Sequence, residues 1–200
     1  MLWQPEGQHL PSEPPLNIVC VVLQTRPLYL HHYGGIYADL DIAAIRPADE
    51  LLALMHKSSI LIGQDCANAD AETCGKNSQH LPNAFMASVR GHQFWMFVMH
   101  GILRGVWEKG IDSAVGEPNW TTGPAPLLWA YKKYVEHANS TDEITILEKQ
   151  IYPYSWADHH GTYSLGCCFD NDNLSMNTSC CQTMFPSSYV MSFWTATWWA

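Results

Sequence analysis

Two aspartates one residue apart, Asp39 and Asp41, are the first residues whose types and spacing suggest chemistry. They close the stretch YGGIYADLD (33–41), an otherwise apolar run in which aspartate is a poor strand former. Side chains at positions i and i+2 of a strand lie on the same side, so two carboxylates there repel each other unless a cation lies between them. The spacing therefore indicates a divalent cation, which would neutralise a diphosphate and make it a better leaving group.

The residues just before the pair favour the same interpretation. Gly34 and Gly35 allow a ligand to approach the backbone closely, and Tyr33 and Tyr37 offer flat surfaces for a base or a sugar. The alternative is a strand end with two solvated carboxylates.

A phosphohydrolase is a second functional alternative, because its D-x-D-x-T/V motif uses the first aspartate as a nucleophile. Here Ala43 takes the place of the threonine or valine, and no lysine followed by an Asp-Asp pair occurs later. The phosphohydrolase hypothesis therefore ranks well behind cation binding.

The composition indicates one globular domain. The 200 residues are 47% hydrophobic and include nine tryptophans and nine tyrosines, which excludes a disordered chain. The net charge of −9, with only ten lysines and arginines, argues against a nucleic-acid partner. No run reaches the roughly 20 apolar residues that span a bilayer.

Strands and helices are expected to alternate, which predicts the α/β class. We expect a loose tail over residues 1–15 and a single domain over 16–200. The predicted strands cover Leu16–Leu23, Ile36–Leu40, 58–65, 83–91 and the segment ITILEKQIYPYSW (144–156). The predicted helices end near Tyr33, start at Pro47 as the first helical residue, run from about His92 to Lys109 and stop at Gly110, and open at TTGPAP (121–126). Polar loops are expected over 66–81 and in the Cys-rich region.

Cysteines and glycosylation sequons crowd together late in the chain. Four of the seven cysteines form two vicinal pairs, Cys167–Cys168 and Cys180–Cys181, and four N-x-S/T sequons occur, at Asn119, Asn139, Asn173 and Asn177. We expect disulfides among the four vicinal cysteines, and a further pair between Cys66 and Cys74, in an oxidising compartment. The connectivity stays open. Reduced cysteines in a cytosolic protein are the alternative, and a zinc site ranks lower because vicinal cysteines lack the usual gap between ligands.

The segment RPLYLHHYGGIYADLDIAAIRP (26–47) resembles the signature R-Y-x-x-L-x-x-Y-G-G-I-Y-x-D-x-D of the DXD sugar transferases, glycosyltransferase family 32. Three later segments are similar to further motifs of that family, in the same order: NAFMASVRGHQFW (83–95), TTGPAPL (121–127) and YVMSFWTATW (189–198). The resemblance covers residues 26 to 199. It implies a GT-A-like fold and a retaining transferase that moves mannose from GDP-mannose, with Mn²⁺, onto a glycan or sphingolipid acceptor in the Golgi or another secretory lumen.

The resemblance also implies roles for individual residues. Asp39 would contact the donor sugar or ribose, and Asp41 would ligate the Mn²⁺ under the diphosphate; both are the expected catalytic residues and metal ligands. The remaining donor-binding residues it implies are Arg26, Tyr33, Gly34, Gly35, Tyr37, Asn83, Gly123 and Pro124. Asn83 could equally be a turn residue, and Gly123-Pro124 a helix start. No carboxylate is assigned as a nucleophile on the sugar.

Three positions depart from the family pattern. The aspartate expected three residues before Arg26 is Leu23, and Pro27 replaces the tyrosine that follows the arginine. The family's closing metal-ligand histidine corresponds to Ser192, for which His159 and His160 could substitute. Part of the N-terminal nucleotide-binding half is expected to be missing, and any membrane association would depend on segments absent from this chain. The alternative function is a truncated, non-catalytic fragment that binds metal or a partner.

Overall fold

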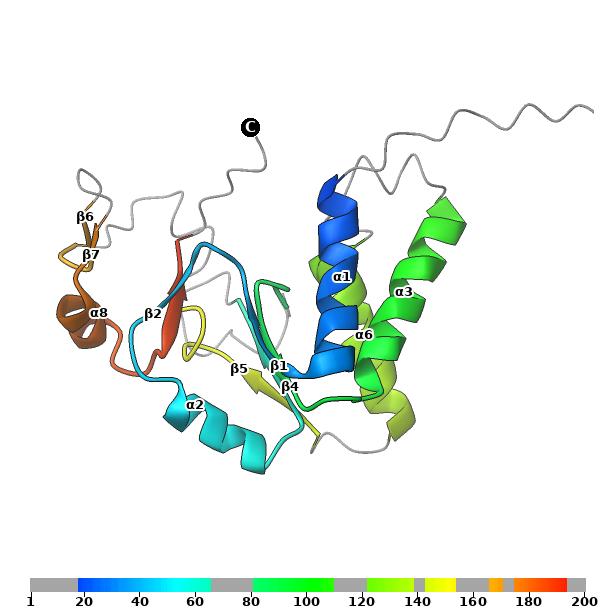
Figure 1. Ribbon diagram of the computed structural model, residues 1–200, viewed down its shortest axis with the longest axis horizontal. Helices are drawn as coiled ribbons and strands as arrows, with labels where there is room; N and C mark the ends of the chain where they lie inside the picture. The colour runs from blue at the N-terminus through cyan, green and yellow to red at the C-terminus, as the bar shows by residue number, and fades with distance from the viewer. Residues whose placement is uncertain are drawn as a thin grey trace, which may run out of the picture.

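A computed structural model describes residues 18–65, 81–109, 122–138, 143–153, 166–170 and 175–193 (Figure 1). The helices are α1 (Ile18–Tyr33), α2 (Asp49–Ala53), the 3-10 helix η1 (Leu54–His56), α3 (Phe94–Lys109), α6 (Pro124–Ala138) and α8 (Thr178–Met184). The strands are β1 (Gly35–Ala38), β2 (Ile42–Ala44), β3 (Ile60–Gly63), β4 (Phe85–Ser88), β5 (Ile144–Leu147), β6 (Phe169–Asp170), β7 (Ser175–Met176) and β8 (Val190–Ser192). The architecture is mixed α/β.

The main sheet has four strands in the order β1-β4-β3-β5. Strand β4 is antiparallel to both β1 and β3, and β5 is parallel to β3. Strands β1, β3 and β5 therefore point the same way, and their carboxyl ends meet at one edge of the sheet. Two small sheets, β2-β8 and β6-β7, complete the fold.

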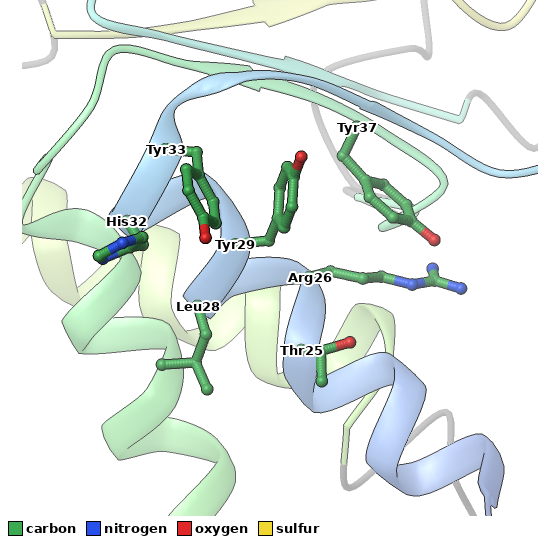
Figure 2. Close-up of a pocket in the computed structure, with 7 residues that line it drawn as sticks. All are labelled: Thr25, Arg26, Leu28, Tyr29, His32, Tyr33 and Tyr37. Atoms are coloured by element: carbon green, nitrogen blue, oxygen red, sulfur yellow. The ribbon is translucent and has the colours of Figure 1, made fainter.

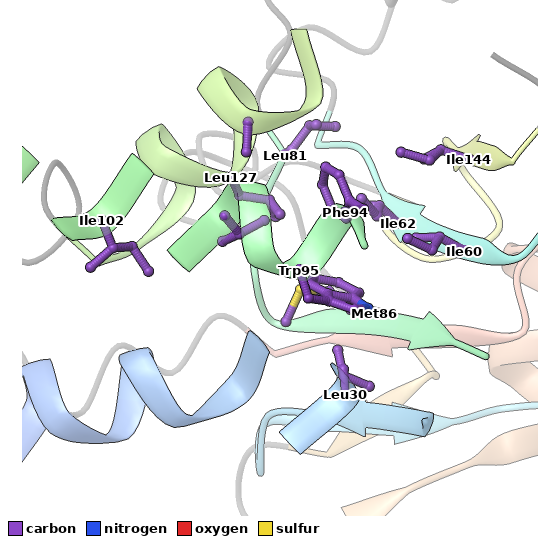
Figure 3. Close-up of a cluster of buried hydrophobic side chains, with 12 residues drawn as sticks. Leu30, Ile60, Ile62, Leu81, Met86, Phe94, Trp95, Ile102, Leu127 and Ile144 are labelled. Carbon is purple, nitrogen blue, oxygen red and sulfur yellow. The ribbon is translucent and has the colours of Figure 1, made fainter. Parts of the chain in front are cut away.

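Three helices, α1, α3 and α6, stand together beside one face of the main sheet (Figure 1). Phe94 and Ile102 of α3 are buried in the core between them (Figure 3), and so is Val98, as the helical spacing predicted. Trp95 is also buried, and its indole N–H donates to Ser88 Oγ at 2.7 Å, so its polar atom is satisfied inside the core.

Strand β3 is covered on both faces. Ile60 and Ile62 belong to the core under the three helices, whereas Leu61 packs into a second cluster on the opposite face with Ile151 and Tyr152. A strand buried on both faces reads as a continuous apolar run, which is why ILIG was recognisable in the sequence.

The four vicinal cysteines form the two disulfides Cys167–Cys180 and Cys168–Cys181, as expected for these four. Cys168 and Cys181 are fully buried in a third apolar cluster that includes Met191. The segment around them, expected to be a loop, contains the helix α8. The expected Cys66–Cys74 pair lies outside the described residues.

The predicted strand over Leu16–Leu23 is wrong, because residues from Ile18 onward belong to α1. A short apolar run does not distinguish a strand from a helix, and the helix continues past Pro27 to Tyr33. Pro27 lies inside the helix.

The start of the next predicted helix is also shifted. Helix α2 begins at Asp49 with Ala48 as its N-cap, so Pro47 precedes the helix instead of being its first residue. Leu51 is buried as expected, but Leu52 is 40% exposed.

The last predicted strand is shorter than expected, because β5 ends at Leu147. The expected tail over 1–15 lies outside the described residues, as does nearly all of the 66–81 loop. Among the described helices, none is both long and apolar enough to cross a membrane.

Candidate functional site at the carboxyl edge of the sheet

The two aspartates lie in a tight turn rather than on a strand. Strand β1 ends at Ala38, and the Asp39 N–H donates to the Ala84 carbonyl at 2.8 Å. The Ile42 N–H then donates to the Asp39 carbonyl at 3.0 Å, which closes a four-residue turn with Leu40 fully exposed. Aspartate is favoured at the first position of such turns. The expectation that strand alternation places Asp39 and Asp41 on one side is therefore wrong, although the pair does follow a strand end.

Asp39 is held by two neighbours. Its Oδ1 accepts an ion-paired contact from Arg26 Nη2 at 2.9 Å and a hydrogen bond from the Tyr37 hydroxyl at 2.6 Å. Arg26 also donates from Nη1 to the Asn83 carbonyl at 3.0 Å, and its guanidinium lies 4.9 Å from the centre of the Tyr37 ring. Thus the cation beside Asp39 is Arg26, and four of the expected site residues meet here.

The protonation of this group reflects its partial burial. Burial raises the pKa of Asp39, while the Arg26 charge and the Tyr37 hydrogen bond oppose that rise and the Asp41 charge adds to it. Burial and the hydrogen bond to Asp39 also raise the pKa of Tyr37. Since the Asp41 charge disfavours the ionised form of Asp39, a further positive charge near the pair would be favourable.

A third carboxylate belongs to the same edge. Asp65 follows β3 as Asp39 follows β1, and these two strands run in the same direction. The side chain of Tyr152 is buried. Its pKa is raised by burial and by the charges of Asp39, Asp65 and Asp41. All three carboxylates therefore act on one buried group. Asp65 and Tyr152 were not recognised in the sequence, because only the strand order places them near the turn.

The last described strand, β8, lies next to the D-x-D turn. Strand β8 is antiparallel to β2, with Ser192 opposite Ile42, and the Phe193 N–H donates to the Asp41 carbonyl at 2.8 Å. Ser192 is buried. The position that corresponds to the family's closing histidine thus lies beside Asp41, about 150 residues away in the sequence.

A cavity of about 490 Å³ opens next to Arg26 and Tyr37. Figure 2 shows Tyr29 and Tyr33 projecting from one flank of α1, with Tyr37 of β1 facing Arg26. The full lining consists of Thr25, Arg26, Leu28, Tyr29, His32, Tyr33 and Tyr37. Leu28, Tyr29 and Tyr33 are 47%, 54% and 64% exposed, so this cavity is an open groove along α1. Tyr33 and Tyr37, expected as flat surfaces, both line it.

The two glycines have different surroundings. Gly34 adopts φ +69° directly after α1, its N–H donates to the Leu30 carbonyl at 2.9 Å, and a Cβ there would lie 2.7 Å from the Arg90 nitrogen. It is a helix C-terminal glycine in close contact with a neighbouring turn. Gly35 also has a positive φ, but open space surrounds it.

The remaining expected residues lie elsewhere or outside the described part. Gly123 and Pro124 form the start of α6 and do not line the cavity. Asn83 lies in a turn before β4 and contributes its backbone carbonyl. His159 and His160 lie outside the described residues.

The donor set for a metal consists of two carboxylates. No group of three His, Cys, Asp or Glu side chains suited to a metal ion occurs within the described ranges. A divalent cation bound through phosphates commonly uses only one or two protein carboxylates, with water and phosphate oxygens as the other ligands. Asp41 and the second oxygen of Asp39 fit that pattern.

A separate polar cluster lies at the opposite edge of the sheet. The Tyr134 hydroxyl donates to Glu143 Oε2 at 2.5 Å, and His92 Nε2 lies 3.4 Å from the same oxygen. His92 Nδ1 accepts from the Phe94 N–H at 3.2 Å, so this histidine caps the start of α3. Burial lowers the pKa of His92.

No protein-family model matches the chain, and no curated protein is significantly similar to it.

Proposed function

We propose that this chain is a metal-dependent glycosyltransferase domain of GT-A-like fold, which moves mannose from GDP-mannose to a glycan or glycolipid acceptor. The observation that carries the proposal is the meeting of the D-x-D turn with β8. The Asp41 backbone carbonyl accepts a hydrogen bond from the Phe193 N–H, so the first and last motifs of the proposed family adjoin. Three carboxylates at the same edge of the sheet, Asp39, Asp41 and Asp65, add to this support, since ligands of α/β sheets commonly bind at the carboxyl ends of strands.

In the proposed mechanism, Asp41 and the second oxygen of Asp39 would hold the divalent cation. A cation held there would supply positive charge to the diphosphate, which would then be a better leaving group. Arg26 and Tyr37 both bind Oδ1 of Asp39 and so fix the orientation of its carboxylate. Tyr33 and Tyr37 line the adjoining cavity, and the base or the sugar of the donor would pack against their rings.

The secretory lumen is the proposed compartment. Its support is the pair of disulfides, Cys167–Cys180 and Cys168–Cys181, because disulfides persist in oxidising compartments.

A non-catalytic fragment that binds metal or a partner is the second candidate, and one observation favours it. Arg26 already neutralises Asp39, so the turn does not require a metal for its stability. The two candidates differ in turnover rather than in metal binding.

A donor screen tests the proposed function. The purified chain is incubated with Mn²⁺ and a panel of nucleotide sugars, and thermal stabilisation and donor hydrolysis are measured. We expect GDP-mannose to raise the melting temperature only with Mn²⁺ and to be hydrolysed slowly. Chelation of the metal and the Asp41→Asn variant are the controls. Stabilisation without hydrolysis would favour the non-catalytic candidate. No response to any nucleotide sugar would contradict both the proposed donor binding and the proposed sugar transfer.

A further inference from the structure

We infer that Asn177 is a site of N-linked glycosylation. Asn177, Thr178 and Ser179 form an N-x-S/T sequon, and all three residues are exposed on the surface of the described structure. This inference is independent of the proposed sugar transfer by the chain itself, since here the chain is the acceptor of a glycan.

The oxygen and the nitrogen of the Asn177 side-chain amide would have different roles. Its Oδ1 accepts a hydrogen bond from the Cys180 N–H at 3.1 Å and so caps α8. Its Nδ2 donates to no group in the described part of the chain. A glycan replaces one hydrogen of Nδ2 and leaves Oδ1 an acceptor, so the modified residue can still cap the helix. Folding and modification are therefore compatible at this position.

The backbone around Asn177 is also suitable. Its φ of −94° and ψ of 93° are extended, and the following Ser179 keeps its side chain exposed. In Figure 1, α8 lies at the end of the molecule away from α1, α3 and α6. A bulky glycan there would extend into solvent without meeting the tyrosine cavity.

The disulfides provide the second, independent observation. Cys180 and Cys181, immediately after the sequon, are both bonded to cysteines before it. Chains that acquire such bonds pass through an oxidising compartment, which is also where sequons meet the glycan-transferring enzyme. The segment therefore contains an exposed sequon next to two disulfide-bonded cysteines, and those disulfides indicate an oxidising compartment.

The chemical step balances without further reagents. The Asn177 Nδ2 attacks the anomeric carbon of a lipid-diphosphate-linked oligosaccharide supplied by the cell. A carbon–nitrogen bond forms, the bond from that carbon to the diphosphate oxygen breaks, and the lipid diphosphate leaves with the electron pair. The Nδ2 proton passes to a base of the transferring enzyme.

Three variants separate the glycan from the helix cap. Ser179→Ala removes the sequon but keeps the Asn177 cap, and Asn177→Asp keeps a capping oxygen but removes the attacking nitrogen. Thr178→Ala changes the exposed middle residue and preserves the sequon, so it is the matched control. Each is expressed in full length behind a cleavable signal peptide in a eukaryotic secretory host.

The measurement is mass spectrometry of the peptide that contains Asn177, before and after an N-glycosidase that converts a glycosylated asparagine to aspartate. Fragment spectra distinguish Asn177 from Asn173. We expect a glycan at Asn177 in the unchanged chain and in Thr178→Ala, and none in Ser179→Ala or Asn177→Asp. An unmodified Asn177 in protein with both disulfides formed would overturn the inference. Material retained in the cell is analysed in the same way, because glycan transfer precedes export.

Discussion

Arg26 of α1 and Asp39 at the end of β1 form an ion pair with 2.9 Å between Nη2 and Oδ1. The pair joins the last two turns of the helix to the first residue of the D-x-D turn. The side chains of Arg26 and Asp39 are only 10% and 26% exposed, so solvent screens this pair less than a surface salt bridge. One protein cation therefore sets the geometry of the residue expected to contact the donor.

Replacing Arg26 by methionine should destabilise the fold. The change removes the ion pair, the hydrogen bond to the Asn83 carbonyl and the contact with the Tyr37 ring, and leaves a half-buried carboxylate without its cation. We expect a loss of about 2 kcal/mol in the free energy of unfolding, measured by urea denaturation.

Two comparisons make the Arg26→Met result specific. Arg90→Met, at an exposed arginine, should change stability by less than about 0.5 kcal/mol. Adding Asp39→Asn to Arg26→Met should recover part of the loss, because the uncompensated charge is gone. Equal losses in the single and double variants would show that the ion pair is not the cause.

Asp41→Ala should abolish Mn²⁺-dependent binding of a nucleoside diphosphate. Removal of one charged ligand leaves only one oxygen of Asp39 for the cation, and the diphosphate charge is then uncompensated. Isothermal calorimetry with GDP in the presence of Mn²⁺ measures the effect, with Asp49→Ala at an exposed position of α2 as the control. Unchanged binding by Asp41→Ala would remove Asp41 from the metal site.

The two adjacent glycines should respond differently to alanine. Both have positive φ angles, at which an alanine is strained by about 1–2 kcal/mol. Only at Gly34 does the new Cβ meet a backbone atom, the Arg90 nitrogen at 2.7 Å, and overpacking adds about 1–3 kcal/mol. Denaturant titration should therefore show the larger loss for Gly34→Ala, and equal losses would mean that the contact with Arg90 relaxes freely.

Elements whose side chains repeat with the period of their structure could be predicted from the sequence. The apolar spacing of Phe94, Val98 and Ile102 marked α3, and the continuous run of β3 marked a strand covered on both faces. The run Leu16–Leu23 was misassigned because its length and composition suit either structure.

Features that depend on chain topology could not be read locally. The turn over 39–42 follows from hydrogen bonds to Ala84 and within the turn, which the D-x-D spacing alone does not reveal. Asp65 follows β3 and Tyr152 follows β5, and they approach the turn only because these two strands run in the same direction as β1. The contact of Phe193 with Asp41 likewise requires the closing strand.

Acidification should destabilise the protein through His92. Burial lowers the pKa of His92 in the fold, and the neighbouring Glu143 opposes this effect while His31 adds to it. The unfolded chain, with a histidine pKa of about 6.5, then binds the proton more readily than the folded chain. Stability contributed by neutral His92 is therefore complete above pH 6.5 and decreases as the pH falls below it. Protonation also removes the acceptor Nδ1 that caps α3.

The His92→Asn variant isolates this effect, because the asparagine side-chain oxygen is a hydrogen-bond acceptor that does not titrate. Urea denaturation at several pH values between 5 and 8 should show a flatter dependence for His92→Asn than for the unchanged chain. His100→Asn, at an exposed position of the same helix, should leave the dependence as it was. A slope that survives in His92→Asn would assign the pH dependence to other groups.

The nucleotide base should contribute little to donor binding. Strand β1 is the first strand of its sheet, no described strand pairs with its other edge, and Gly35, Ile36 and Ala38 are exposed. A base lying beyond the D-x-D turn on that side would meet no neighbouring strand among the residues that the structure describes, so we expect its burial to add little affinity. We therefore expect GDP and pyrophosphate to bind with similar affinity in the presence of Mn²⁺.

Competition binding of GDP, UDP and pyrophosphate against a labelled nucleotide measures this difference. If either nucleotide binds a hundred-fold or more tightly than pyrophosphate, a difference of about 2.7 kcal/mol, the base is held by the protein. The tyrosine cavity beside Arg26 would then be its binding surface, and Tyr33→Ala should reduce nucleotide affinity while leaving pyrophosphate affinity unchanged. Similar affinities for all three ligands would instead show that the nucleotide is held at the turn through the metal and the diphosphate.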